Sequence, residues 1–367
     1  MSPSTKRVLI LGGYGAAGKA IAMQLSNRST VTITIAGRSI DKAQACTEEL
    51  RRESPVGTDF LAASVDVTDR EQVARACEEQ ELVILACDTS LASLENVIRA
   101  CVANGADYVD IAPDSRKLAV FESLATLIEA GQSRFVLDAG ADPGLPGWLA
   151  QWLSQQAPEP LDQMQLFARY RSDEIGWSGV ADILSASDSQ GWVYDGHHWQ
   201  RSSVWDFKWK RFTGGLGLSL CVPIRLDELE SLPEKLGLHT FKCYHAGLNP
   251  VTDALMMLEG TALPRIISFE TRQRMFFRAL KRFTSRPFGL SIEAVGQGAG
   301  RRFRMAIGHA DLYAATAIPA AVMSEFLLND TNQSPGFGYL GDWASVHSTF
   351  LEDLRDEGFW FENEALS

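Results

Sequence analysis

The sequence has few of the side-chain patterns that metal sites and nucleophilic catalysis require. Its six histidines form no His-x-His or His-x-x-x-His pair, and its six cysteines show no Cys-x-x-Cys spacing, so no metal site is predicted. The stretch "GWSGV" around Ser178 lacks the Gly-x-Ser-x-Gly spacing of a nucleophile elbow. No tyrosine is followed four residues later by lysine, which excludes the Tyr-x-x-x-Lys pair of short-chain dehydrogenases.

Long apolar runs and an excess of positive charge are missing as well. No stretch reaches the roughly 18 uninterrupted apolar residues of a membrane span, and the "VLILGG" that follows Lys6 and Arg7 is too short for a signal peptide. A formal net charge of -12 and a pI near 5.1 argue against a nucleic-acid-binding protein. Most of the cysteines fall in apolar patterns, which indicates buried, reduced thiols and a cytoplasmic location.

The N-terminal part of the chain alternates short β-branched runs with helical stretches. Strands separated by helices of this length predict a parallel sheet covered on both faces, and six strands make a complete Rossmann domain. At 367 residues the chain is long enough to bury a second core. The six predicted strands are 7–11, 31–36, 60–66, 82–86, 108–112 and 134–139.

The first predicted turn, "GGYGAAGKA", is typical of a dinucleotide-binding loop. Gly13 permits the tight turn, Gly15 lets the backbone approach a pyrophosphate, and Gly18 allows the following helix to pack closely. The free N–H groups at the start of that helix then face the anion. The predicted cofactor contacts in this loop are Gly13, Tyr14, Gly15, Ala16, Ala17 and Gly18.

The end of the second predicted strand indicates which dinucleotide binds. The position that is acidic in NAD-binding chains, about 20 residues past the glycine turn, falls here on Gly37 and Arg38. Glycine removes the carboxylate that would repel a 2′-phosphate, while Arg38 and Ser39 offer hydrogen-bond donors to it. The predicted cofactor is therefore NADP(H). The alternative is a solvated arginine at a strand end.

Ligands of parallel sheets lie beyond the carboxyl ends of the strands, and this adds two groups of predicted contacts. The third strand delivers Asp66 and Val67 toward the adenine. The fourth delivers Cys87, Asp88 and Thr89 toward the nicotinamide.

Together these stretches resemble the saccharopine dehydrogenase and saccharopine reductase superfamily. The resemblance rests on "GGYGAAGKAIA", "AGRS", "CVANGADYVDIAPD", "DAGADPGLPGWLA" and, near the C-terminus, "DLYAATAIPAA". It covers 6–150 and 309–330 well, and the residues between them loosely. It implies an α/β protein with a doubly wound Rossmann NADP-binding domain at 1–145 and an inserted α+β substrate domain at 146–310. The segment 311–367 would return to the Rossmann domain through a helix.

The reaction follows from the resemblance alone. It implies hydride transfer between NADP(H) and a C=N or C–N bond of a small amino-acid-like or polyamine-like substrate, where a nearby carboxylate would favour a cationic iminium. A C=C reductase of the same superfamily and a non-catalytic NADP-binding regulator are the alternatives. The candidate catalytic aspartates, at the ends of the fifth and sixth strands, are Asp142, Asp110, Asp114 and Asp138. Asp142 is the first choice, and capping of the "DPG" turn is its alternative role.

Two further segments carry predictions. Residues 271–304 hold nine cations against the single acid Glu293, and predict a helix followed by a β-hairpin turning at 298–300. This segment is either a solvated surface beside an arginine-protected sheet edge, or a surface for an anionic substrate, an acidic carrier or a membrane. The tryptophan-rich residues 148–209 predict antiparallel strands with one buried face. A homodimer is a further expected assembly.

Overall fold

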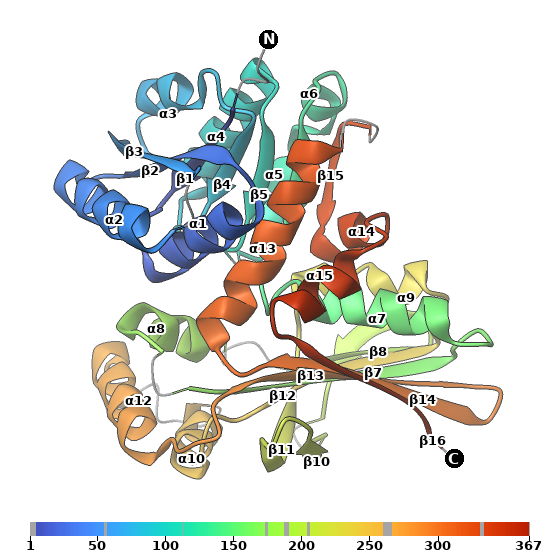
Figure 1. Ribbon diagram of the computed structural model, residues 1–367. Helices are drawn as coiled ribbons and strands as arrows, with labels where there is room; N and C mark the ends of the chain where they lie inside the picture. Colours follow the sequence, from blue (N-terminus) through green and yellow to red (C-terminus); the bar gives the residue numbers. More distant parts are fainter. Residues whose placement is uncertain are drawn as a thin grey trace. The chain divides into compact units, whose positions relative to one another are not determined.

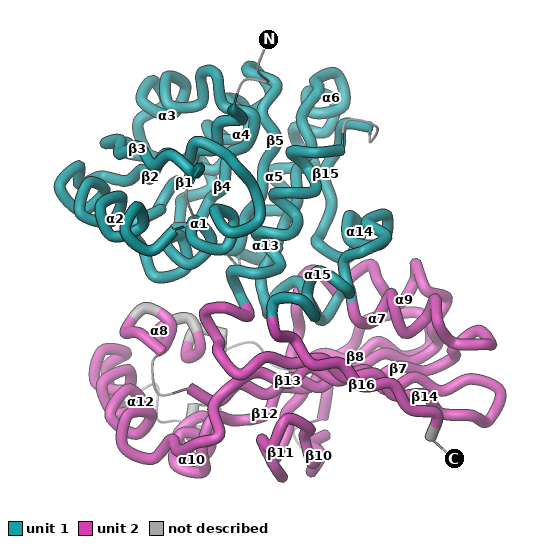
Figure 2. Tube along the Cα trace, viewed as in Figure 1, with its two compact units in different colours: residues 1–148, 316–357 teal, residues 149–315, 358–367 magenta. Residues whose placement is uncertain are grey.

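The computed structural model describes residues 5–54, 57–112, 114–172, 175–186, 191–203, 206–259, 266–330 and 334–366. The chain divides into two compact units, which Figure 2 colours separately. The first unit holds residues 1–148 and 316–357, and the second holds residues 149–315 and 358–367. The divisions at 148 and 315 fall within helices, α7 (Leu145–Gln156) and α13 (Leu312–Asn329).

The first unit is built on a parallel seven-stranded sheet in the order β15-β6-β5-β4-β1-β2-β3 (Figure 1). The order turns back between β1 and β4, so the connecting helices cover both faces, as in the predicted doubly wound Rossmann fold. The seventh strand, β15, was not predicted, because two glycines in "GFGY" resemble a turn. The strands are β1 (Lys6–Leu11), β2 (Val31–Gly37), β3 (Asp59–Ser64), β4 (Leu82–Leu85), β5 (Asp107–Asp110), β6 (Arg134–Leu137) and β15 (Gly336–Tyr339).

The helices of the first unit begin at polar caps that are readable in the sequence. Ser39, Asp69 and Ser90 each accept a hydrogen bond from a backbone N–H in the first turn of the helix that follows. These helices bury their apolar residues against the sheet. They are α1 (Ala16–Arg28), α2 (Ile40–Glu53), α3 (Arg70–Cys77), α4 (Leu91–Asn104), α5 (Lys117–Ser123), α6 (Ala125–Glu129), α14 (Leu340–Ala344) and α15 (Phe350–Asp356).

The returning segment 316–357 is attached to the Rossmann sheet by a charged cluster as well as by packing. The guanidinium of Arg28, at the end of α1, donates to Glu325 at 2.7 Å, Asp353 at 2.8 Å and Glu357 at 2.9 Å. The Arg28 side chain is only 11% exposed, so the three carboxylates hold a largely desolvated cation. The predicted helical return is confirmed by α13, which supplies Glu325.

Helix α13 is long and apolar enough to cross a membrane by length and composition, with a mean hydropathy of 1.2. Within it, however, 61% of the 18-residue window is buried inside the protein, as in a core helix. Its Pro319 lies in the helix interior.

The second unit is built on a nine-stranded sheet whose main path is β10-β11-β12-β7-β13-β14-β16. Strand β7 runs parallel to β12 and antiparallel to β13, and the β8–β9 hairpin pairs with β12. The strands are β7 (Gln163–Arg171), β8 (Trp192–Asp195), β9 (His198–Arg201), β10 (Lys208–Phe212), β11 (Gly217–Ile224), β12 (Thr240–Ala246), β13 (Gly289–Gly298), β14 (Arg301–His309) and β16 (Trp360–Leu366). The helices that follow α7 are α8 (Trp177–Ala186), α9 (Leu232–Lys235), α10 (Pro250–Glu259) and α12 (Phe269–Phe283), with a 3-10 turn at Asp227–Leu229.

The predicted helix and hairpin of residues 271–304 are confirmed as α12 and β13–β14. The hairpin turns through Ala299 and Gly300, whose φ values of 46° and 77° are those of a tight two-residue turn. Strand β14 is not a sheet edge, because β16 pairs with it from Gly308↔Trp360 to Arg302↔Leu366. The last residues, 358–367, therefore lie in the second unit and not with the rest of 311–367.

The basic segment 271–304 is not one continuous surface. Arg304 is largely buried, and its Nε donates to Glu293, which is fully buried, at 2.9 Å. Lys210 adds a second cation to Glu293 at 2.8 Å, and the backbone N–H of Thr213 donates to it at 3.1 Å. These partners offset the cost of burying the carboxylate, and they lower the pKa of Glu293 although burial alone would raise it.

Where the tryptophan-rich segment was expected to form strands, three of its tryptophans lie in helices α7 and α8, and Trp205 lies outside the described residues. Helix α7 begins at Leu145, inside the Pro- and Gly-rich stretch "DPGLPG". Pro146 lies in the first turn of α7. Proline is tolerated there because the N–H groups of a first turn have no acceptor within the helix.

Candidate functional site

The glycine turn after β1 packs so closely that side chains would not fit. The N–H groups of Gly12 and Gly13 both donate to the carbonyl of Ala36, at 2.9 and 3.1 Å. A Cβ on Gly18 would lie 2.5 Å from the Gly12 carbonyl oxygen, and one on Gly12, whose φ is +81°, would lie 2.6 Å from Cβ of Cys87. The turn therefore brings the start of α1 directly beside β4.

The start of α1 is open to a ligand. Gly15 and Ala16 are exposed, Tyr14 and Ala17 are half-buried, and the N-cap Gly15 has no side chain with which to cap the helix. The first N–H groups of the helix thus face outward with the positive end of the helix dipole. A pyrophosphate fits this cradle, as the sequence predicted for Gly13, Gly15 and Gly18.

The absence of a side chain at Gly37 has a structural cause that the sequence did not reveal. A Cβ at this position would lie 2.5 Å from the ring of Tyr14, so any side chain here would displace the tyrosine. The Tyr14 hydroxyl in turn accepts a long hydrogen bond of 3.4 Å from the Ser39 N–H. Tyr14 therefore both excludes an acidic residue at position 37 and shapes the loop that carries Arg38.

Arg38 is exposed at the end of β2. In the part of the chain that the structure describes, no ion pair of its guanidinium is found, and Asp66 and Cys87 lie within electrostatic range of it. The hydroxyl of Ser39 caps α2 through the Lys42 N–H at 3.4 Å, which leaves its proton free to donate to a phosphate. Both residues are thus placed to hold a 2′-phosphate.

The other predicted cofactor contacts are at the strand ends, with differing environments. Asp66 accepts from the Thr68 N–H at 2.9 Å and the Thr68 hydroxyl at 2.8 Å, and this turn lowers its pKa. Val67, next to it, is half-buried against the core. Burial and then the neighbouring Asp88 raise the pKa of Cys87 to about 11, so its thiol stays protonated. Asp88 is exposed and Thr89 half-buried.

A buried ion cluster joins the carboxyl ends of β5 and β6. The ammonium of Lys117 donates to Asp110 at 2.6 Å, to Asp138 at 2.5 Å and to the Ala112 carbonyl at 2.8 Å. All three charged side chains are at most 5% exposed. Burial lowers the pKa of Lys117, but the two carboxylates outweigh burial and hold it above its ordinary value.

The carboxylate of Asp110 is thus held on both of its oxygens, and its catalytic role stays a prediction. One oxygen of its carboxylate is held by Lys117 and by the Asp138 N–H at 3.0 Å, and the other accepts from Tyr108 at 3.1 Å. Sequence reasoning missed Lys117 because a lysine in the first turn of a helix is ordinarily solvated. One signal was present in the sequence: Lys117 follows "YVDIAPD" closely, and the next predicted strand also ends in an aspartate, Asp138.

Asp114 is also engaged. Its carboxylate accepts from the Arg116 guanidinium at 2.9 and 3.0 Å, which lowers the pKa of Asp114. Asp142 follows β6 in a turn whose Leu145 N–H donates to the Gly140 carbonyl. The residue is half-buried, and both of its carboxylate oxygens are shielded from solvent.

The geometry of the first unit has a counterpart among known proteins. Residues 8–138 match the family model of the saccharopine dehydrogenase NADP-binding domain. The fold is similar to that of apo saccharopine dehydrogenase (L-Glu forming) from Saccharomyces cerevisiae, with a TM-score of 0.71 and 14% identity. The match covers 99% of this chain and 100% of the yeast chain. Residues 8–138 are thus similar to a saccharopine dehydrogenase NADP-binding domain, and the fold of the whole chain is similar to that of the yeast enzyme.

Other comparisons are weaker. Amine dehydrogenase from Mycobacterium smegmatis has a TM-score of 0.48 at 13% identity, over 92% of this chain and 95% of that one. No curated protein sequence matches the chain. The family model confirms NADP(H) as the cofactor of this saccharopine dehydrogenase-like protein, an NADP-dependent oxidoreductase.

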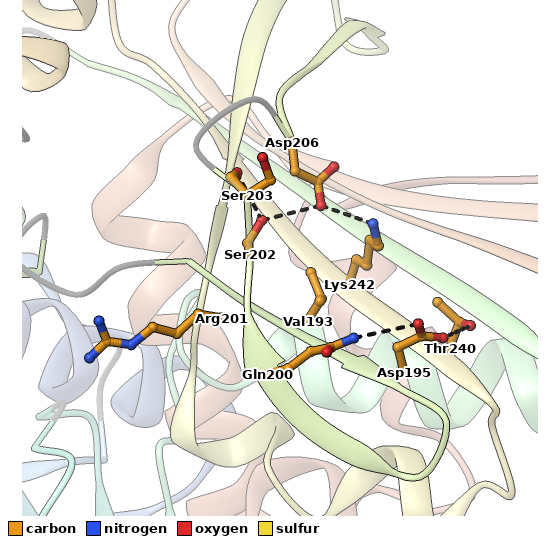
Figure 3. A pocket seen from close by; sticks show the side chains of 9 residues that line it. All are labelled: Val193, Asp195, Gln200, Arg201, Ser202, Ser203, Asp206, Thr240 and Lys242. Carbon is orange, nitrogen blue, oxygen red and sulfur yellow. Dashed lines mark hydrogen bonds and ion pairs between the residues drawn. The ribbon is translucent and has the colours of Figure 1, made fainter.

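A hollow of about 530 Å³ in the second unit contains none of the predicted site residues (Figure 3). Its polar groups already satisfy one another. The Asp206 carboxylate accepts from Lys242 at 2.9 Å, Tyr244 at 2.9 Å and Ser202 at 3.2 Å. Within the described residues, no three His, Cys, Asp or Glu side chains gather as a metal ion would require. We assign no reaction to this hollow.

Replacing Arg38 by alanine is expected to weaken NADPH binding by about ten- to a hundred-fold, because a charge-assisted contact to the 2′-phosphate contributes about 1.5–3 kcal/mol. NADH binding should be nearly unchanged. Fluorescence titration of both cofactors measures this. Arg52→Ala on α2 is the control, because Arg52 is exposed and donates to the Glu48 carbonyl of its own helix. Equal affinity of the unaltered protein for NADH and NADPH would contradict the assignment of Arg38.

Proposed function

We propose that the protein transfers a hydride between NADP(H) and a C=N or C–N bond of a small amino-acid-like or polyamine-like substrate. The observation that carries the proposal is the place of Asp142. It follows β6, at the carboxyl edge of the sheet where the cofactor turn also lies, and its carboxylate oxygens are shielded from water. A carboxylate in such surroundings favours a cationic iminium over a neutral carbonyl compound.

Each group of residues has one task in this proposal. The turn at Gly13, Gly15 and Gly18 holds the pyrophosphate, and Arg38 with Ser39 holds the 2′-phosphate. When it is bound, the nicotinamide supplies the hydride chemistry, so the chain has to bind, orient and exclude water. Lys117 keeps Asp110 and Asp138 in place beneath the loop that presents Asp142. The six reduced cysteines support a cytoplasmic location.

A substrate panel tests the proposal directly. NADPH consumption should appear with mixtures of a carbonyl compound and an amine or amino acid, and should be absent with either component alone, because only the mixture forms an imine. NADPH oxidation is followed by its absorbance, with enoyl compounds as the parallel arm. Turnover restricted to the enoyl compounds would show that C=C bonds are reduced, and tight NADPH binding with no turnover in any arm would indicate a regulator.

A further inference from the structure

The β10–β11 hairpin exposes large apolar side chains on its outer face, while Lys208 and Lys210 on its other face are half-buried. Trp209 is 64% exposed, Leu218 55%, Phe207 44% and Val222 43%. Residues of β10 alternate, so Lys208 and Lys210 point the other way. The hairpin was expected to bury its aromatic face, and the structure reverses that expectation.

The reversal has a cause within the second unit. Glu293 is fully buried on the sheet and takes Lys210 as a partner, while Lys208 donates to Gln165 at 3.2 Å and lies 5.6 Å from the Tyr244 ring centroid. Pairing these lysines inward fixes the face of β10, and the aromatic side chains are left outward. An apolar patch of this kind marks a contact surface more often than not.

Helix α12 offers a second unusual surface. Phe276 and Leu280 face the core, while Arg274, Arg278 and Arg282 follow one another at four-residue steps on the exposed side. Like charges at this spacing disfavour the helix by a few tenths of a kcal/mol per pair. Among the described residues, Glu270 is the one acid that pairs with this row, through Arg274 at 2.7 Å. An external anionic surface would relieve the repulsion.

The hairpin and the helix lie at the same edge of the second unit. In Figure 1 the β10–β11 hairpin and helices α10 and α12 all lie at its lower edge. Helix α10 adds exposed Val251 and Leu258 there. A flat partner can therefore touch the hairpin and the helices together.

Charge decides what kind of partner this surface fits. Residues 269–286 contain six cations and one acid, and Arg211 is exposed beside Trp209 on β10, in a chain of net charge -12. A second copy of the chain would bring cations against cations across a two-fold axis. An anionic lipid surface complements the arginines and also accepts exposed tryptophan and phenylalanine at the depth of its headgroups.

We propose that the second unit docks on anionic lipid membranes, with the outer face of the β10–β11 hairpin entering the headgroup layer and the arginine row of α12 lying on it. Each cation near such a surface strengthens binding about five-fold. The proposal goes beyond the hydride-transfer function and does not depend on it, since membrane binding is measured without substrate.

The test is co-sedimentation of the full chain with vesicles of phosphatidylcholine alone and of phosphatidylcholine mixed with phosphatidylglycerol. Binding is expected on the mixed vesicles only, and should weaken as salt is raised. Replacing Arg274, Arg278 and Arg282 together by glutamine should weaken it about a hundred-fold. Trp209→Ser should weaken vesicle binding about ten-fold, because serine has no large apolar surface to transfer from water into the headgroup layer.

The matched control removes the same charge from the other unit. Arg52, Arg75 and Arg99 are exposed on helices of the first unit, and their joint replacement by glutamine should leave vesicle binding unchanged. Circular dichroism establishes that every variant is folded. Three results would overturn the proposal. The protein would fail to bind mixed vesicles at low salt and bind polyglutamate instead, or the control variant would lose as much vesicle binding as the α12 variant. The third is a dimer in solution that Trp209→Ser dissociates.

Discussion

Replacing Lys117 by methionine is expected to lower the free energy of unfolding by about 3–5 kcal/mol, because it leaves Asp110 and Asp138 buried without their cation. For a chain of this size that corresponds to a fall in the melting temperature of about 10 °C. Thermal and urea unfolding, followed by circular dichroism at pH 7, measure the change. Methionine keeps the length of the lysine stem, so the loss reports the charge and not a cavity.

The contribution of Lys117 to the free energy of unfolding should depend on pH in a defined direction. The folded-state pKa of Lys117 lies above its ordinary value, so its contribution is complete below about pH 10 and is lost only as the pH rises through the folded pKa. The unaltered protein therefore carries the full contribution at pH 7. In Lys117→Met the two unpaired aspartates should instead take up protons more readily when folded, so the deficit should shrink as the pH falls toward 5.

A matched control separates burial from charge. Lys19 forms an ion pair with Glu49 in which both side chains are more than 30% exposed. Lys19→Met should therefore cost less than about 1 kcal/mol. A similar small cost for Lys117→Met would show that the cluster is not the anchor of β5 and β6 described above.

Asp142→Asn is expected to lower kcat by about a hundred- to ten-thousand-fold on any imine that the substrate panel identifies. The amide keeps the size of the side chain but cannot stabilise a cationic substrate. NADPH affinity should be unchanged, because the glycine turn and Arg38 are untouched. Single-turnover oxidation of NADPH and a fluorescence titration measure the two quantities separately.

Asp114→Asn is the matched control for this prediction. It makes the same chemical change at a carboxylate that already pairs with Arg116. Its effect on kcat should be less than a few-fold. An unchanged kcat in Asp142→Asn would leave the carboxylate with the turn-capping role alone, and the proposed mechanism would then lack the group that stabilises the iminium.

Most of the nucleotide-binding unit could be predicted from the sequence because its signals are local. Each of the six strands precedes its own helix, the glycines stand together in one turn, and caps such as Ser39 and Asp69 precede their helices directly. The order of the strands then follows from short right-handed connections. The same local character allows Arg38 to be predicted as the cofactor-selecting residue.

Other features were decided by contacts between distant residues. The four residues of β15 form a strand because β6, some two hundred positions earlier, offers an edge to pair with. Strand β16 joins the second unit through its pairing with β14 and through the ion pairs of Arg304 with Glu362 and Glu364.

Side-chain roles at distant contacts were equally out of reach. The alternation of Lys208, Trp209 and Lys210 predicts a strand with two unlike faces, but a buried Glu293 decides that the lysines point inward. Likewise, two aspartates at strand ends suggest acids, and only the tertiary structure reveals that Lys117 neutralises Asp110. The sequence by itself thus determined the nucleotide-binding fold and its cofactor, because periodicity and turns act over neighbouring residues. The tertiary structure alone decided which charges are buried together, because desolvation depends on every element that packs around a group.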